Sequence, residues 1–189
     1  MIRIGILGDI GSGKSYVAQR FGYPVFNADK EVIKLYKKDS KVFQKLTKSL
    51  PKFIHSFPID KSEITEAILS NNSNLKKIIK IVHKEVRKKM NAFLRKNKNK
   101  RIVVLDIPLL LENKINNKND ILVFVESKKN DILKRLKNRN NFNKKLYKKF
   151  RNIQLPQSYK KKKSRFVIKN DFTVKSVKKD IKNILSQII

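Results

Sequence analysis

Short apolar runs alternate with amphipathic segments along this chain of 189 residues. Five runs have the length and the apolar or β-branched content of buried strands, and they cover residues 2–7, 24–26, 102–105, 121–125 and 166–168. Two longer segments, 75–94 and 174–188, repeat apolar residues every three or four positions, which predicts amphipathic helices. Strands separated by helices are typical of a parallel sheet. We therefore expect an α/β fold with a five-stranded parallel sheet flanked by helices.

The intervening segments predict shorter elements. In chain order they are helices over 16–21 and 30–38, short helices over 39–70 broken by Pro51 and Pro58, and a sharp turn into a short helix over 107–112. Residues 138–163 are very polar and end in a run of four lysines, Lys160 to Lys163. Such a segment predicts a mobile flap or a solvated helical hairpin. With no internal repeat, we expect one unit over 1–189.

The charge is strongly positive, with 47 Lys and Arg against 15 Asp and Glu, a formal net charge of +32. Clustered cations would favour nucleic acid, because they release phosphate counterions. The cations here are 38 Lys against 9 Arg, however, and the lysines are spread over the whole chain. Lys also shares A/T-rich codons with the abundant Asn and Ile. We interpret most lysines as a solvated surface that attracts polyphosphates at long range, and expect no specific nucleic-acid partner.

The composition excludes several other classes of site. The chain has no cysteine, which excludes disulfides and thiolate zinc sites, and its only two histidines, His55 and His83, argue against a multi-histidine metal site. No apolar run approaches the roughly 20 residues that a bilayer span needs. The N-terminus enters a strand directly, unlike a signal peptide. We expect a soluble, cytoplasmic protein with no membrane partner, and a monomer as the working state, with an oligomer left open.

A glycine-rich turn between the first strand and the first helix carries the clearest chemistry. Residues 8–15, Gly-Asp-Ile-Gly-Ser-Gly-Lys-Ser, fit the pattern G-x-x-x-x-G-K-[ST] at every fixed position. Its glycines let the backbone N–H groups curl around a phosphate, and the helix that follows adds its positive end. Lys14 would reach the β- and γ-phosphates, and Ser15 would give a hydroxyl oxygen to Mg²⁺. The turn predicts a nucleoside triphosphate site but not the reaction.

Two carboxylates follow predicted strands. Asp29 comes after the second strand, where residues line the ligand crevice of an open parallel sheet. It can orient or deprotonate an attacking hydroxyl, or it can cap the helix over 30–38, and position alone favours neither. Asp106 ends the strand over 102–105, the usual place for a carboxylate that holds Mg²⁺ directly or through water; simple capping is the alternative.

Arg135 and Arg139 lie four residues apart on a predicted helix and would share one face. Cations at the base of a flap can close on a transferring phosphate and stabilise its developing charge. The alternative is a solvated helix face.

Taken in order, these motifs resemble the dephospho-CoA kinase family over almost the whole chain. The resemblance rests on the turn over 6–15, on Val25 to Asp29, on Ile81 to Arg87, on Asp106 to Glu112, on the two arginines, on Gln154-Leu155-Pro156 followed by Lys160, and on Phe166 to Asn170. It implies a P-loop kinase core, a helical acceptor-binding region over 30–97 and a lid over 138–163. It also implies transfer of the ATP γ-phosphate to the ribose 3′-hydroxyl of dephospho-CoA, the last step of coenzyme A synthesis.

The same resemblance implies roles for individual residues. Catalytic roles fall to Asp29, Lys14 and Arg139; ATP binding to Gly8, Asp9, Ile10, Gly11, Ser12, Gly13, Lys14, Ser15, Tyr16, Arg135 and Asn170; acceptor binding to Asp29, His83, Arg87, Pro108 and Glu112; and Mg²⁺ binding to Ser15 and Asp106. Asn170 would lie beside the adenine of ATP. From the sequence alone, the better interpretation of His83 is a helix residue beside an apolar stripe.

The chain also departs from the family pattern. Asp9 replaces a usual glycine, Asn27 the first Asp of an Asp-Ala-Asp segment, Lys84 a proline and Arg165 an Asp. Arg151 is one place away from a frequent arginine. The departure at position 9 predicts a carboxylate that faces solvent or weakens nucleotide binding. None of them removes a group that phosphoryl transfer requires.

Overall fold

The computed structural model describes residues 1–139 and 142–189. Its chain divides into two compact units. Unit 1 contains Met1–Asn27, Asn97–Phe142 and Arg151–Ile189, and unit 2 contains Ala28–Lys96 and Asn143–Phe150. The acceptor-binding and lid roles assigned to 30–97 and 138–163 stay predictions.

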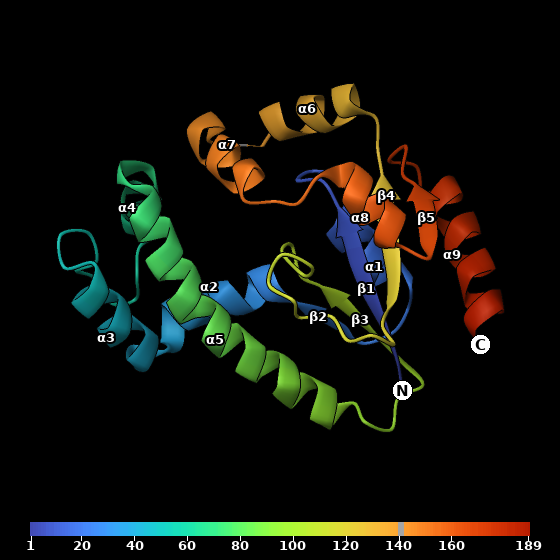
Figure 1. The fold of residues 1–189 in the computed structure, drawn as a ribbon, viewed down its shortest axis with the longest axis horizontal. Coiled ribbons are helices and arrows are strands. Elements are labelled where there is room, and N and C mark those ends of the chain that lie inside the picture. Colours follow the sequence, from blue (N-terminus) through green and yellow to red (C-terminus); the bar gives the residue numbers. More distant parts are fainter. Residues whose placement is uncertain (140–141) are drawn as a thin grey trace. The chain divides into compact units, whose positions relative to one another are not determined.

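A five-stranded parallel sheet forms the centre of unit 1 (Figure 1). The strands are β1 Ile2–Gly8, β2 Val25–Asn27, β3 Ile102–Asp106, β4 Ile121–Glu126 and β5 Phe166–Lys169. Their order is β2-β3-β1-β4-β5, with every pairing parallel. This confirms the predicted α/β fold. The predicted phosphate-binding turn therefore leaves the carboxyl end of the central strand β1.

Helices pack on this sheet through apolar residues spaced by helical turns. Ile4 and Ile6 of β1 share one core cluster with Val17 of α1 (Lys14–Arg20) and with Val177 and Ile181 of α9 (Val174–Ile188). The neighbouring position, Gly5, points elsewhere, because a Cβ there would meet Leu110 and Leu122. Helix α8 (Gln157–Lys163) contacts β1 and β4, and α6 (Lys129–Lys137) follows β4.

Unit 2 is helical. It contains α2 Ala28–Lys38, α3 Ser40–Ser49, α4 Lys61–Ser70, α5 Asn72–Lys96 and most of α7 Lys144–Asn152. Helix α5 buries Leu75, Ile78, Val82, Val86 and Met90, the stripe that the periodicity predicts, and α2, α3 and α4 contact it. The expected breaks at Pro51 and Pro58 fall between α3 and α4. No helix within the described ranges is long and apolar enough to cross a membrane.

Several local predictions are wrong. The helices expected to begin at residues 16 and 30 begin two residues earlier, at Lys14 and Ala28. Residues 108–114 form successive turns instead of a short helix. The segment 138–163 contains α7 and α8, with residues 140 and 141 outside the described part. Its lysine run is not uniformly solvated, because the Lys160 side chain is only 1% exposed.

Candidate active site

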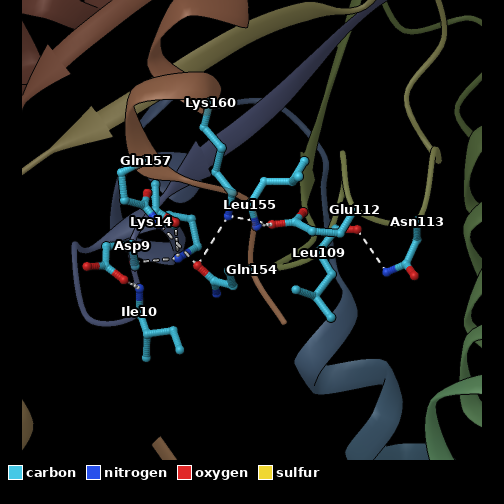
Figure 2. Close-up of polar contacts among 11 residues, drawn as sticks. Asp9, Ile10, Lys14, Leu109, Glu112, Asn113, Gln154, Leu155, Gln157 and Lys160 are labelled. Atoms are coloured by element: carbon cyan, nitrogen blue, oxygen red, sulfur yellow. Dashed lines mark hydrogen bonds and ion pairs between the residues drawn. The ribbon is translucent and has the colours of Figure 1, made fainter. Parts of the chain in front are cut away.

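The predicted phosphate-binding turn has the backbone of an anion cradle. Gly8, Gly11 and Gly13 have φ angles of 147°, 88° and 90°, a region that favours glycine. Lys14 Nζ donates to the carbonyl oxygens of Gly8 at 3.2 Å and Asp9 at 2.7 Å (Figure 2). The Lys14 ammonium therefore lies over the loop that it belongs to. Glycines at positive φ that lead directly into a helix are the features that a phosphate-binding loop needs, and phosphate binding here stays a prediction.

Asp9, the unusual residue of this loop, uses its carboxylate locally. Its Oδ1 accepts a hydrogen bond from the Ile10 N–H at 2.7 Å (Figure 2). The side chain is half-buried, so it does not simply face solvent. It places a negative charge inside the loop, and the bond to Ile10 occupies one of the loop's N–H donors.

Two side chains that follow other strands, Asn170 after β5 and Ser127 after β4, bond to the same backbone carbonyl of the cradle. The Ser12 oxygen accepts from Asn170 Nδ2 at 2.8 Å and from Ser127 Oγ at 3.0 Å. Asn170 is buried and follows β5, and its Oδ1 accepts from the Phe172 N–H at 3.0 Å. A Cβ on Gly13 would lie 2.3 Å from Asn170 Nδ2. Asn170 therefore fixes the loop, a contact that the sequence did not indicate.

Asn27 and Asp106 meet at the carboxyl ends of β2 and β3. They are register partners, and Asn27 Nδ2 donates to Asp106 Oδ2 at 2.5 Å. Asp106 is buried, whereas Ser15 at the start of α1 is exposed. No cluster of three or more His, Cys, Asp or Glu suited to a metal occurs among the described residues. Asp106 and Ser15 stay predicted Mg²⁺ ligands, since a carboxylate and a hydroxyl are oxygen donors of the kind that Mg²⁺ takes.

Arg135 and Arg139 do not share a helix face. Helix α6 ends at Lys137, so Arg139 lies beyond it, which corrects that prediction. The Arg135 guanidinium lies 4.1 Å from the centre of the Phe172 ring, a cation–π distance. Phe172 also lies next to the position that a Cβ on Gly13 would occupy. Arg135 thus belongs to the surroundings of the cradle, through a residue that sequence reasoning missed.

A buried ion pair joins the turns after β3 to α8. Lys160 Nζ lies 2.7 Å from Glu112 Oε1 and donates to Gln154 Oε1 at 3.2 Å (Figure 2). The Leu155 N–H also donates to Glu112 Oε1, at 3.0 Å. Pro108 lies at the start of the same turns. The family-like segment over 154–160 was the sequence signal for this network.

The other predicted site residues lie in unit 2 or on α1. Asp29 is the second residue of α2 and is exposed, so it lies inside the first helical turn and is not the cap. His83 and Arg87 lie four residues apart on α5, half-buried and exposed respectively. Tyr16 on α1 packs against the core of unit 1, with the Arg20 guanidinium 4.9 Å from its ring centre.

Comparison with known proteins agrees with this geometry. The family model described as dephospho-CoA kinase matches residues 2–176. The dephospho-CoA kinase of Wolbachia pipientis wMel is 33% identical over 190 residues, covering 98% of this chain and 97% of its own length. That of Ehrlichia canis is 31% identical over 194 residues, covering 100% and 96%.

Solved structures show the same fold. The protein TT1252 from Thermus thermophilus superimposes with a TM-score of 0.80 at 25% identity, covering 100% of this chain and 98% of that one. The dephospho-CoA kinase from Campylobacter jejuni gives a TM-score of 0.64 at 20% identity, covering 98% and 96%. The sheet order and the glycine-rich loop, together with the match to the kinase family model, define a P-loop kinase. More narrowly, the chain belongs to the dephospho-CoA kinase family, which catalyses the final step of coenzyme A biosynthesis.

Proposed function

We propose that the loop Gly8–Ser15 holds ATP while its γ-phosphate is transferred to the ribose 3′-hydroxyl of dephospho-CoA. The observation that carries this proposal is the cradle itself, with three glycines at positive φ and Lys14 folded over them, in a chain of this kinase family. Asn170 and Ser127 support the loop from the ends of neighbouring strands. Support of this kind matters because phosphoryl transfer depends on positioning and charge, with little covalent chemistry from the protein.

Lys14 moves from loop carbonyls to phosphate oxygens when ATP binds. In its bonds to the carbonyls of Gly8 and Asp9, only the Lys14 ammonium is charged. Bonds to phosphate oxygens have charge on both sides and are stronger. The exchange therefore favours bound nucleotide and brings the cation to the β- and γ-phosphates, with Arg135 and Arg139 as further cations for the transferring group.

Ser15 and Asp106 are the residues that would hold Mg²⁺, Asp106 through water. The Asn27 amide donates a hydrogen bond to Asp106 Oδ2 and so fixes the orientation of the carboxylate. Oδ1 is then the oxygen that would accept from the Mg²⁺-bound water. The oxygen donors fit this cation. When bound, Mg²⁺ neutralises phosphate charge.

The acceptor is handled by Asp29 together with the predicted substrate residues. Asp29 carries an exposed carboxylate two residues beyond Asn27 in the chain. It accepts the proton of the 3′-hydroxyl or orients that hydroxyl toward the γ-phosphate. His83, Arg87 and Pro108 contribute to acceptor binding, and Asn170 borders the adenine of ATP. The chain works as a monomer, which size-exclusion chromatography with light scattering tests.

A coupled assay of ADP release with and without dephospho-CoA tests the proposal. We expect release that depends on dephospho-CoA, with coenzyme A as the product and little release with shikimate. Asp29→Asn should lower kcat by about 100-fold or more, the low end for a lost general base, and leave the KM for ATP within about twofold. Glu31→Gln in the same helical turn is the matched control and should keep full activity. Near-normal kcat in the Asp29 variant would refute its role; ADP release independent of acceptor would refute the proposed reaction.

A further inference from the structure

Lys160 differs from every neighbouring lysine in its run. Its side chain is 1% exposed, whereas Lys161 is 47% exposed and pairs at the surface with Glu126 at 2.6 Å. An ammonium group is strongly hydrated, so its burial is costly unless it is paired and hydrogen-bonded. The partners are Glu112, itself only 9% exposed, and the Gln154 side-chain oxygen.

The Glu112 carboxylate is already bonded to other groups of the protein. Its Oε1 receives both the Lys160 ammonium and the Leu155 N–H. Its Oε2 is buried and has no hydrogen-bond partner among the residues that the structure describes. Neither oxygen is therefore presented at the surface as a ready acceptor for a ligand, although the family resemblance places Glu112 at or near the acceptor site.

The network joins two segments that are far apart in sequence. Glu112 lies in the turns after β3 that begin at Pro108. Gln154 and Leu155 precede α8, which contacts β1 and β4. Figure 2 shows Glu112 and Gln154 converging on the Lys160 ammonium, with Leu155 beside them. The network therefore ties the turns that carry Pro108 to a helix packed on the sheet.

Stability alone does not explain a buried pair here. Replacing such a pair with well-packed apolar residues is often neutral or stabilising, whereas removing one partner leaves a buried charge. A directional pair instead fixes one geometry, because the ammonium must face a carboxylate and an amide oxygen at once. The fixed geometry is that of the turns after β3.

We propose that Lys160, Glu112 and Gln154 are positioning residues that hold the turns after β3 in the shape that binds dephospho-CoA. Glu112 then acts on the acceptor through the network and not by touching it. This inference rests on the proposed function, because the acceptor is the dephospho-CoA named there. It assigns a role to Lys160 and Gln154 and changes the role predicted for Glu112.

A double-mutant cycle on the full-length enzyme tests the inference. Lys160→Met and Glu112→Gln should each raise the KM for dephospho-CoA by about tenfold, the size expected for a lost bond to a charged group. The KM for ATP should change less than about threefold, because the cradle has its own supports. Since both variants break one network, the double variant should raise the KM for dephospho-CoA by the same factor of about ten as either single variant, and not by the product of the two effects. Lys161→Met, on the same helix, is the matched control and should behave as wild type.

Several results would overturn the inference. If the two effects multiply in the double variant, Glu112 acts independently and contacts the substrate. If either single variant leaves the KM for dephospho-CoA unchanged, or raises both KM values equally, the network does not position the acceptor site. If a single variant fails to fold, the double variant can still be measured, because it lacks both charged groups and so buries no unpaired charge. A folded double variant with the wild-type KM for dephospho-CoA would refute the proposal.

Hydrogen exchange provides a readout that does not need activity. The Leu155 amide is bonded to Glu112, so Lys160→Met should speed its exchange and that of residues 107–115, and Lys161→Met should not. Unchanged exchange at Leu155 would overturn the network's positioning role even if dephospho-CoA proved not to be the acceptor. Failure of the wild-type chain to phosphorylate dephospho-CoA would instead refute the proposed function.

Discussion

Replacing Gly13 with alanine tests how tightly the cradle is held by the strand ends around it. Gly13 has φ 90° and precedes α1 as its N-cap. A left-handed backbone at a residue with a Cβ costs about 1–2 kcal/mol. The new Cβ would also lie 2.3 Å from Asn170 Nδ2, closer than nonbonded atoms approach, so Asn170 must move.

The cost of moving Asn170 follows from its bonds. Nδ2 donates to the Ser12 carbonyl at 2.8 Å, and Oδ1 accepts from the Phe172 N–H at 3.0 Å. Each bond contributes about 0.5–1.5 kcal/mol, so losing both costs about 1–3 kcal/mol. Added to the backbone strain, Gly13→Ala should lower the free energy of unfolding by about 2–5 kcal/mol.

Gly22→Ala separates the two contributions. Gly22 has φ 75°, just past the other end of α1, and a Cβ there meets no described atom within 4 Å beyond its chain neighbours. Its substitution should cost only the strain of about 1–2 kcal/mol. Equilibrium urea unfolding of both variants should therefore place Gly13→Ala below Gly22→Ala by about 1–3 kcal/mol. Equal unfolding free energies would refute the contact between the cradle and Asn170.

Three further changes test other parts of unit 1. Lys14→Ala should abolish acceptor-dependent ADP release, and turnover near the wild-type rate would contradict the cradle assignment. The Ser176 hydroxyl donates a hydrogen bond to Asp171 and lowers the pKa of that carboxyl from 3.8 to about 2. The ionised Asp171 carboxylate therefore stabilises the folded state above pH 3.8, and this stabilisation is lost as the pH falls to about 2. Acid unfolding of Asp171→Asn should lack this pH-dependent loss, and an unchanged profile would refute the link. Gly5→Ala places a Cβ 2.6 Å from Leu110 Cδ2 and should lower the free energy of unfolding, measured by thermal unfolding, by about 1–3 kcal/mol. Adding Leu110→Val should restore part of this free energy, and no restoration would contradict the contact.

The strands and the cradle were predictable because their residues meet strong local requirements. All five residues of β3 are buried, and its run of Ile, Val, Val and Leu suits a strand covered on both faces. The glycines at positions 8, 11 and 13 adopt the positive φ angles that the motif needs. Local sequence is sufficient where one backbone conformation or one burial pattern excludes the alternatives.

Helix ends were less predictable because they depend on where packing stops. Helix α6 buries Ile132 and Leu136 and ends at Lys137. The next position on that face, 139, is an Arg, whose charged guanidinium does not continue the apolar stripe. Helical spacing alone predicts Arg139 on helix α6, whereas the apolar face through which α6 packs ends at Leu136.

The burial of Lys160 was not predictable from its own segment. Successive helical residues rotate by about 100°, so only some members of a lysine run face the sheet. The residue that makes burial acceptable, Glu112, lies in the turns after β3 and comes near only in the folded chain. The four lysines are equivalent in sequence and become different only through this distant carboxylate.

The departure at position 27 is explained by the neighbouring strand. Asn27 and Asp106 are register partners at the ends of β2 and β3. An Asp at position 27, as in the family pattern, would place a second carboxylate at hydrogen-bond distance from Asp106, and two ionised carboxylates repel each other. The Asn27 amide donates to Asp106 Oδ2 instead and fixes that carboxylate at the strand end. The substitution therefore removes a negative charge beside Asp106 and adds a donor, so it keeps the carboxylate on which the proposed Mg²⁺ site depends.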